Sequence, residues 1–134
     1  MIVDSSALVA VLAQEPDAAL FSRLMGESSR VRVSTATVLE TSLVVGPNGV
    51  DGLDLLLRSA GADVVPFDHA QLDQARFGHF RYGRGRGSRA GLNFGDCFSY
   101  ALAVTSGEPL LFKGGDFSRT DVAPALAAGS PAAT

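Results

Sequence analysis

The sequence predicts an α/β fold, a three-layer α/β/α sandwich in which a mainly parallel sheet of four or five strands lies between helices. Short apolar runs alternate with longer segments of helical periodicity, an order typical of β-α-β units around a parallel sheet. Turn residues such as the run Gly46-Pro47-Asn48-Gly49 separate these segments. The length of 134 residues suits one domain with a single core.

In the first half of the chain, strands are expected where apolar residues form short or alternating runs, and helices where they recur at three- and four-residue spacing. Either Ser5 or Ser6 can cap the first helix, and Ser34 or Thr35 can cap the third. Gly26 is expected to stop the second helix. The elements expected here are a strand at 1–3, helices at 7–12 and 16–25, a strand at 31–34, and helices at 35–45 and 51–60.

In the second half, Pro66 places the next strand at a sheet edge, because its ring nitrogen cannot donate a hydrogen bond to a neighbouring strand. Asp68 caps the helix that follows, and Asn93 caps a helix that is apolar on most of its circumference, including Phe94. Such a helix is expected to be buried. The elements expected here are a strand at 64–67, a helix at 69–82, a loop at 83–91, the apolar helix from 94, a strand at 109–112 and a short strand near 121–122.

Composition narrows the classes of function. The net charge of −3 does not favour a general nucleic-acid binder, although five arginines and no acid lie between residues 76 and 89. The single cysteine, Cys97, excludes an intramolecular disulfide and a thiolate metal site. The longest apolar run, residues 7–13, is too short to cross a bilayer, so we expect a soluble cytoplasmic protein. Residues 123–134 are mostly Ala, Pro, Gly and Ser, so we expect a domain over 1–122 and a flexible tail over 123–134.

Four acidic residues are expected to lie together at one edge of the sheet. Asp4 and Asp116 each follow a strand, and the carboxyl ends of parallel strands share an edge. Glu40 lies on a largely apolar helix face, where a carboxylate is costly unless it is hydrogen-bonded, paired or coordinating. Asp96 opens the buried helix. Capping offers a simpler interpretation for two of them, since Asp96 would be the third residue of its helix and Glu40 would complete a capping box with Thr37.

Four carboxylates with no positive partner among them cannot all stay ionised at close range without a cation. Ligands that are all oxygen, without His or Cys, favour Mg²⁺ or Mn²⁺. Such a centre activates water and neutralises charge during the cleavage of a phosphodiester. The sequence therefore predicts a metal centre suited to phosphodiester hydrolysis.

The order of these motifs resembles the PIN-domain ribonucleases and, more closely, the VapC toxins of VapBC toxin–antitoxin systems. The similarity covers roughly residues 1–122. It is carried by Asp4-Ser5-Ser6-Ala7 after the first strand, Glu40 within a helix, Asn93-Phe94-Gly95-Asp96 at the start of the buried helix, and the run from Leu111 to Phe117 that contains Asp116.

The resemblance implies a homodimeric, Mg²⁺-dependent endoribonuclease that cleaves RNA with metal-activated water and is neutralised by a cognate VapB-like antitoxin. It implies that Asp4 and Asp96 are the principal metal ligands, that Glu40 assists them, and that Asp116 completes the catalytic and metal-binding set. Asp121 is the alternative fourth acid. Ser6 matches a small hydroxyl residue of the family near the first aspartate and is a candidate for substrate binding.

Arg84, Arg86 and Arg89 are further candidates for substrate binding, because arginines beside an anionic site can attract and orient phosphate. A solvated glycine and arginine loop is the other interpretation. Among other enzyme classes, a receiver domain would need an acidic pair directly after the first strand, and a haloacid-dehalogenase-like phosphatase would need a second aspartate where Ser6 stands. A catalytically silent PIN-like module that binds RNA or protein is the alternative outside the enzymes.

Overall fold

The computed structural model describes residues 1–126, and its centre is a four-stranded sheet in which every pairing is parallel. The strands are β1 (Ile2–Val3), β2 (Arg32–Ser34), β3 (Asp63–Val65) and β4 (Leu110–Leu111), in the order β3-β2-β1-β4. In this register Ile2 lies opposite both Arg32 and Leu110. The α/β class and the parallel sheet are confirmed, and β3 lies at the edge that Pro66 predicted.

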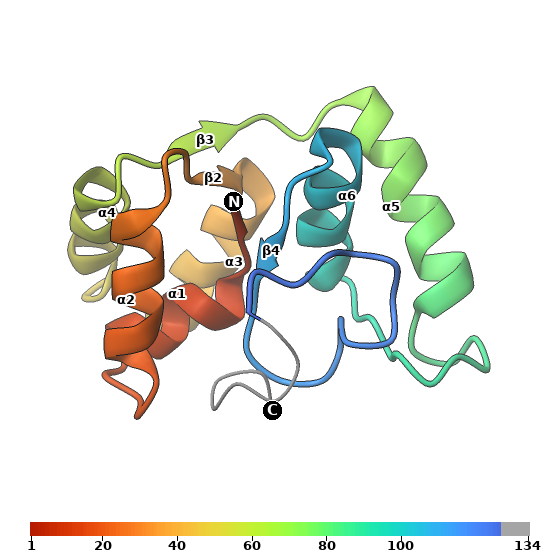
Figure 1. Cartoon of the computed structure of the whole chain (residues 1–134), viewed down its shortest axis with the longest axis horizontal. Coiled ribbons are helices and arrows are strands. Elements are labelled where there is room, and N and C mark those ends of the chain that lie inside the picture. Colours follow the sequence, from red (N-terminus) through yellow and green to blue (C-terminus); the bar gives the residue numbers. More distant parts are fainter. Residues whose placement is uncertain (127–134) are drawn as a thin grey trace.

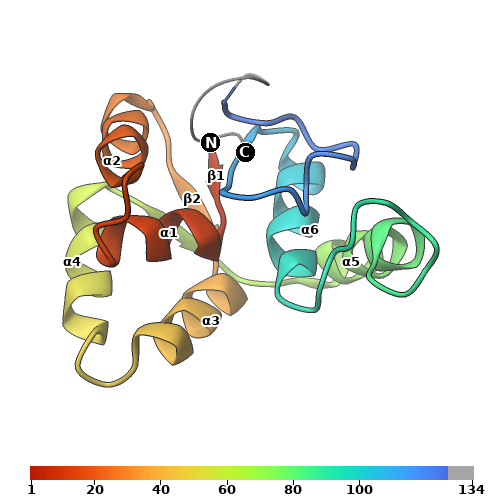
Figure 2. The same ribbon diagram turned by 90° about the horizontal axis from the view of Figure 1, so that it is seen from below.

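Six helices form the outer layers (Figure 1). They are α1 (Ser5–Leu12), α2 (Ala18–Glu27), α3 (Thr35–Val45), α4 (Val50–Ser59), α5 (His69–Tyr82) and α6 (Asp96–Ser106). Figure 2 shows α1, α2 and α4 on one side of the strands and α6 on the other, with α5 packed outside α6. None of the helices in residues 1–126 combines the length and the apolar character needed to cross a membrane.

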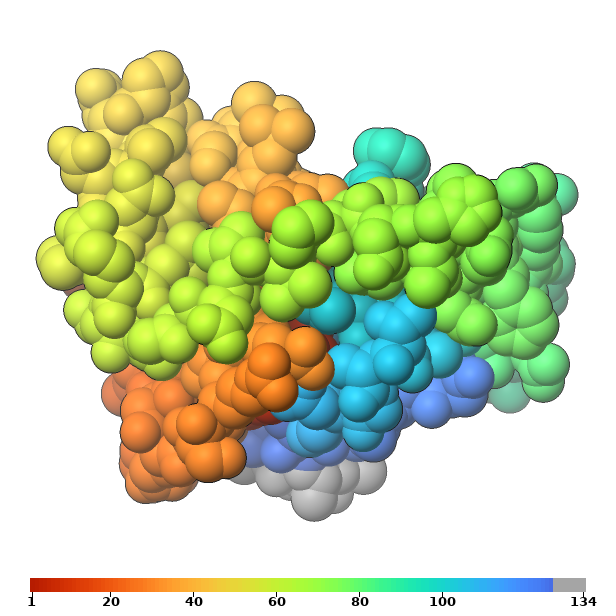
Figure 3. Space-filling view, turned by 90° about the horizontal axis from the view of Figure 1, so that it is seen from above, coloured from red at the N-terminus to blue at the C-terminus, as the bar shows by residue number. Residues whose placement is uncertain are grey.

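The alternation of strand side chains divides the core between these two layers. Val3 and Leu111 pack in the cluster that includes Phe21 of α2, whereas Ile2 and Leu110 pack in the cluster that includes Tyr100 of α6. Successive strand residues point to opposite faces, so even two-residue strands join both halves of the core. Figure 3, viewed from the side opposite to that of Figure 2, shows the segment from α4 through β3 to α5 running across the surface.

Local signals placed most helix ends correctly, with three corrections. Ser34 caps α3 and Asp68 caps α5, as expected. The cap of α1 is Asp4 rather than Ser5 or Ser6, because the Asp4 carboxylate accepts a hydrogen bond from the Ser6 amide. The second helix begins at Ala18 and continues through Gly26 to Glu27, and α6 begins at Asp96, after a turn.

The expected burial of the whole α6 region is wrong at Phe94, whose side chain is 79% exposed. Phe94 precedes the helix proper, and its ring packs edge to face with that of Phe98, with 5.1 Å between the ring centres, instead of entering the core. Within α6, Tyr100, Ala101 and Leu102 are buried as expected.

The first residues of the expected tail, 123–125, pair with β4. Leu110 pairs with Pro124 in an isolated parallel bridge, with hydrogen bonds of 2.8 Å to Ala123 and Ala125 on either side. This bridge replaces the short strand expected near 121–122. The rest of the expected tail, 127–134, lies outside the described residues.

A glycine lets α5 pack closely on α6, and it offers a stability test. A Cβ on Gly78 would lie 2.4 Å from the fully buried ring of Tyr100, so Gly78→Ala is expected to destabilise the protein by about 1–3 kcal/mol through overpacking. Gly52→Ala in α4 is the matched control, since its Cβ would meet only Leu12 at 3.8 Å. The control should be neutral or stabilising by about 0.5–1 kcal/mol. Urea unfolding measures both, and equal stabilities would contradict the packing argument.

Candidate active site

Asp4 is the most completely held of the four predicted acids. It follows β1, caps α1 and is 2% exposed. Its Oδ2 accepts hydrogen bonds from the Ser6 amide at 3.0 Å and the Ser6 hydroxyl at 2.7 Å, and its Oδ1 accepts one from the Ser99 hydroxyl at 2.6 Å. These donors stabilise the ionised carboxylate and fix its orientation.

Two hydroxyl groups around Asp4 connect it to the rest of the fold. The Ser6 hydroxyl also accepts a hydrogen bond of 2.9 Å from the Lys113 amide, directly after β4. Because its proton is committed to Asp4, Ser6 is better suited to positioning that carboxylate than to the predicted contact with substrate. Ser99 was missed by the sequence reasoning. It is fully buried, and its only sequence signal is its place on the helical face of Asp96, three residues earlier.

Glu40 of α3 reaches across to the start of α6. A Cβ on Gly95 would lie 1.7 Å from Glu40 Oε2, so the carboxylate occupies the space that a side chain at position 95 would fill. Glu40 Oε1 is buried and has no hydrogen-bond partner among the described residues. Burial raises the pKa of Glu40, and the negative charge of Asp4 raises it further, against a hydrogen bond from Ser5. A proton, a water molecule or a cation can satisfy a buried carboxylate oxygen that has no protein partner.

Asp96 is the first residue of α6, not the third as the sequence predicted, and its carboxylate takes part in the turn that precedes the helix. Its Oδ2 accepts a hydrogen bond of 3.0 Å from the Asn93 amide, and its own amide donates one of 2.9 Å to the Asn93 side chain. This exchange starts the helix and fixes the carboxylate. Burial, followed by the charges of Asp4 and Asp116, raises the pKa of Asp96 to about 8. In the absence of a cation Asp96 therefore keeps its proton to a higher pH than an ordinary aspartate does.

Of the two candidates for the fourth acid, Asp116 is the one whose charge acts on Asp96. Asp116 lies close enough to raise the pKa of Asp96 through charge and hydrogen bonding. Asp121 instead accepts a hydrogen bond of 2.8 Å from the Tyr100 hydroxyl. The four predicted acids are therefore linked pair by pair, from Glu40 to Asp4, from Asp4 to Asp96 and from Asp96 to Asp116. Figure 2 shows α1, α3 and α6, three of the elements involved, close to β1.

The donor set suits a hard divalent cation without forming a closed cage. Within residues 1–126, no three carboxylate, imidazole or thiol groups lie close enough together to hold a metal ion by themselves. The acids instead affect one another in pairs: the charge of Asp4 raises the pKa of Glu40, and the charges of Asp4 and Asp116 raise the pKa of Asp96. Mg²⁺ is commonly held by one or two carboxylates and several waters, so a closed protein cage is not required. The unpartnered oxygen of Glu40 and the raised pKa of Asp96 both fit a cation at this place.

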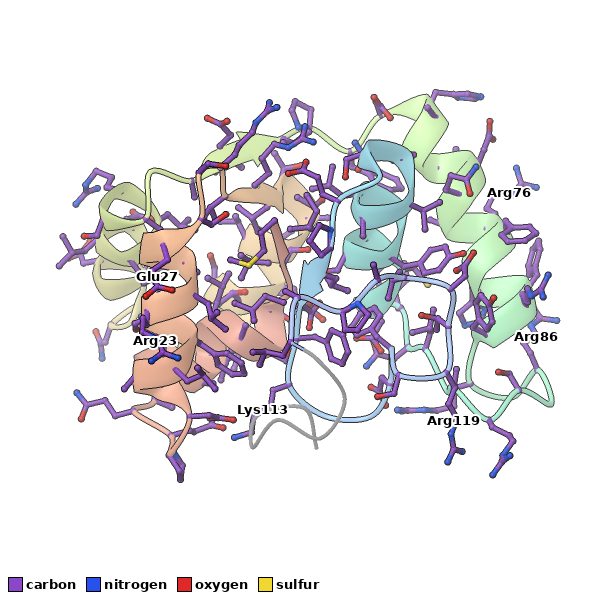
Figure 4. All side chains as sticks on the ribbon, in the orientation of Figure 1. Arg23, Glu27, Arg76, Arg86, Lys113 and Arg119 are labelled. Carbon is purple, nitrogen blue, oxygen red and sulfur yellow. The ribbon has the colours of Figure 1, made fainter. Side chains whose placement is uncertain are left out.

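The lysine and arginines that lie close to the four predicted acids in sequence do not form ion pairs with them among the described residues. Lys113 pairs with Glu15 and Asp17 and with none of the four predicted acids. Arg84, Arg86 and Arg89 are exposed on the loop after α5. Figure 4 shows Lys113 near the N-terminal helices and Arg86 and Arg119 at the other end of the molecule.

A protein family and several known proteins match this chain over nearly its whole length. The model of the PIN domain family matches residues 1–123. A ribonuclease VapC from Mycolicibacterium smegmatis is 51% identical over 127 residues, which are 92% of this chain and 98% of that protein. Ribonuclease VapC30 from Mycobacterium tuberculosis is 52% identical over 128 residues, 92% of this chain and 96% of the relative.

A solved structure resembles the fold. The crystal structure of Mycobacterium tuberculosis VapC20, described as a toxin that cleaves the sarcin-ricin loop, has a TM-score of 0.71 and covers 90% of this chain and 95% of that chain. The sequence identity is 20%, so this likeness concerns the fold alone.

Proposed function

Because this chain belongs to the PIN domain family and is related to VapC ribonucleases over almost its full length, it is a metal-dependent endoribonuclease, and we propose that it acts as a toxin. In this proposal the enzyme uses Mg²⁺, and a cognate VapB-like antitoxin neutralises it. The observation that carries the proposal is a set of four carboxylates that interact pair by pair, one of which has a buried oxygen with no partner among the described residues. A catalytically silent module would have no reason to accept the cost of gathering these charges.

The proposed roles follow from what holds each residue. Asp4 and Asp96 would be the principal ligands of the cation, because hydrogen bonds fix both carboxylates before it binds. Glu40 would contribute its unpartnered Oε1, directly or through water, and Asp116 would complete the set from the loop after β4. When bound, the cation supplies an activated water and neutralises charge on the phosphate. Hydrolysis of this kind leaves a 5′-phosphate and a 3′-hydroxyl.

Cleavage of RNA tests the proposal directly. The purified protein is expected to cut RNA in the presence of Mg²⁺, to leave 5′-phosphate ends, and to stop when EDTA removes the ion. Mn²⁺ is expected to replace Mg²⁺, since both prefer oxygen ligands. RNA binding without cleavage under these conditions would favour the silent module instead.

The arginine-rich loop is proposed to attract the substrate. The protein is acidic overall and its site is anionic, so RNA must approach against repulsion. Arg84, Arg86 and Arg89 lie on the loop that leads toward Asp96, and among the described residues none of the three forms an ion pair with an acid. They are therefore available to phosphate.

We also propose that the protein is a homodimer, and the exposed faces of α3 and α4 support this. Leu43 is 76% exposed, and Leu39, Val44 and Leu55 are each more than half exposed. A group of large apolar side chains on neighbouring helices is typical of a protein interface. Light scattering at micromolar concentration is expected to give the mass of a dimer, and Leu43→Glu is expected to shift the protein toward monomer. A wild-type monomer at that concentration would contradict the proposal.

A further inference from the structure

We infer that a second site, a pocket of about 540 Å³ formed by α5, the loop after it and the loop after β4, binds a backbone phosphate of the RNA other than the one being cleaved. Four arginines from three segments line it: Arg81 at the end of α5, Arg86 and Arg89 on the following loop, and Arg119 on the loop after β4. This inference rests on the proposed function. We call the four the arginine pocket.

The four side chains of the arginine pocket are exposed to solvent. No ion pair within residues 1–126 involves any of its four arginines. Asp121, on the same loop as Arg119, has its Oδ1 engaged by the Tyr100 hydroxyl. Four guanidinium groups around one hollow repel one another until an anion enters, and a guanidinium offers phosphate a planar pair of donors.

Aromatic rings support two of these arginines. The guanidinium carbon of Arg81 lies 5.4 Å from the centre of the Tyr82 ring, and that of Arg86 lies 5.2 Å from the centre of the Phe80 ring. Contact of a cation with a ring face restricts the side chain while its edge remains free to donate hydrogen bonds. The base of the loop is fixed as well, because the Arg84 amide donates a hydrogen bond of 2.8 Å to Leu92 and the Leu92 amide donates one of 2.9 Å to Tyr82.

The two segments that supply most of the arginine pocket also carry two of the catalytic carboxylates. Arg119 follows Asp116 on one loop, and the loop of Arg86 and Arg89 continues directly into the turn before Asp96. Figure 4 shows Arg86 and Arg119 at the same end of the molecule. A strand whose scissile phosphate lies at the carboxylates can therefore place a neighbouring part of its backbone in the pocket.

RNA suits the arginine pocket better than an acidic protein segment does. A protein partner usually adds apolar anchors to its charges. The only large apolar ring among the pocket residues, that of Tyr82, already packs against Tyr100 at 6.0 Å between ring centres. Repeated phosphates need no such anchor, since their binding is largely electrostatic.

The test measures the affinity of a labelled single-stranded RNA for full-length protein in the Asp96→Asn background across a salt series. The slope of log affinity against log salt is negative, and Arg119→Ala and Arg89→Ala are each expected to make it shallower by about 0.7 to 1. Neither variant should move the cleavage site when Asp96 is restored. Arg119→Lys should retain the slope. The matched control is Arg58→Ala, an exposed arginine on α4 that lies outside the pocket and forms no ion pair within residues 1–126.

The outcomes separate this inference from the proposed function. An unchanged slope in Arg119→Ala and Arg89→Ala, with cleavage intact, overturns the pocket alone. A reduced slope in a protein that never cleaves RNA supports the pocket and overturns the proposed function. Poly-glutamate serves as the acidic protein segment. If Arg119→Ala weakens the binding of RNA but leaves the binding of poly-glutamate unchanged, phosphate binding in the pocket is supported; if poly-glutamate binds the pocket and RNA does not, the inference is overturned.

Discussion

Asp96→Asn is expected to lower the rate of RNA cleavage by about 10²–10³-fold, the scale found when one preorganised electrostatic group is removed from an active site. The substitution removes the negative charge that would hold the cation but keeps an oxygen able to accept the hydrogen bond from the Asn93 amide. The start of α6 should therefore survive. Cleavage of labelled RNA under Mg²⁺ measures the loss, and circular dichroism checks the fold.

Asp121→Asn is the matched control for this variant. Asp121 follows Asp116 on the same loop, and its Oδ1 accepts a hydrogen bond from Tyr100, which an asparagine oxygen can also accept. The control should cut RNA at nearly the wild-type rate. Wild-type cleavage by Asp96→Asn, or an equal loss in both variants, would mean that the site has been assigned wrongly.

Asp96→Asn is expected to lower the rate of cleavage but to raise the stability of the metal-free protein. The pKa of Asp96 is raised from 3.8 to about 8 in the fold, so between those pH values the folded protein holds a proton that the unfolded chain has released. The free energy of unfolding should therefore fall as pH rises through this window, by up to about 1.4 kcal/mol per pH unit. Near pH 8 in EDTA, Asp96→Asn should unfold at a higher temperature than wild type.

Added Mg²⁺ should reverse this order, because an ion that binds only the folded state stabilises it. Wild type should gain stability on addition of Mg²⁺, and Asp96→Asn should gain little. A difference in stability between wild type and variant that stays constant from pH 4 to pH 8 in EDTA would contradict the burial of a titrating Asp96.

The second large effect is expected at Gly95, a residue without any reactive group. Gly95→Ala would place a methyl group 1.7 Å from the present position of Glu40 Oε2. The carboxylate is the far end of a flexible side chain, so it can move away and the fold can persist. We expect cleavage to fall by about 10–100-fold, the range typical of residues that orient metal ligands, with a change of less than about 1 kcal/mol in stability. The Mg²⁺ concentration that gives half-maximal activity should rise.

A double-mutant cycle separates positioning from general damage. In a Glu40→Ala background, Gly95→Ala should cause no further loss of cleavage, because the side chain that it displaces is gone. Additive losses would show that Gly95 acts through something other than Glu40. Gly115→Ala serves as a control for a glycine on a nearby loop, since a Cβ there would meet no atom within 4 Å.

The sequence by itself determined the fold class and the order of the main elements, and it predicted which acids lie near one another. These features follow from local rules. Apolar periodicity separates strands from helices, and parallel strands end at one edge of a sheet, so Asp4 and Asp116 could be placed together without coordinates. Asn93 and Asp96 are also neighbours in sequence, and their exchange of hydrogen bonds is a local capping feature.

Only the tertiary structure decided which side chains touch across elements distant in sequence. The contact of Glu40 with Gly95, the hydrogen bond from Ser99 to Asp4 and the place of Arg119 in the arginine pocket each depend on how helices and loops pack. The same is true of Phe94, whose apolar character predicted burial but whose backbone lies in a turn at the surface. Local propensity determines which element forms, whereas the angle and distance between packed elements come from the fit of many side chains at once, and this fit selects the partners of each residue.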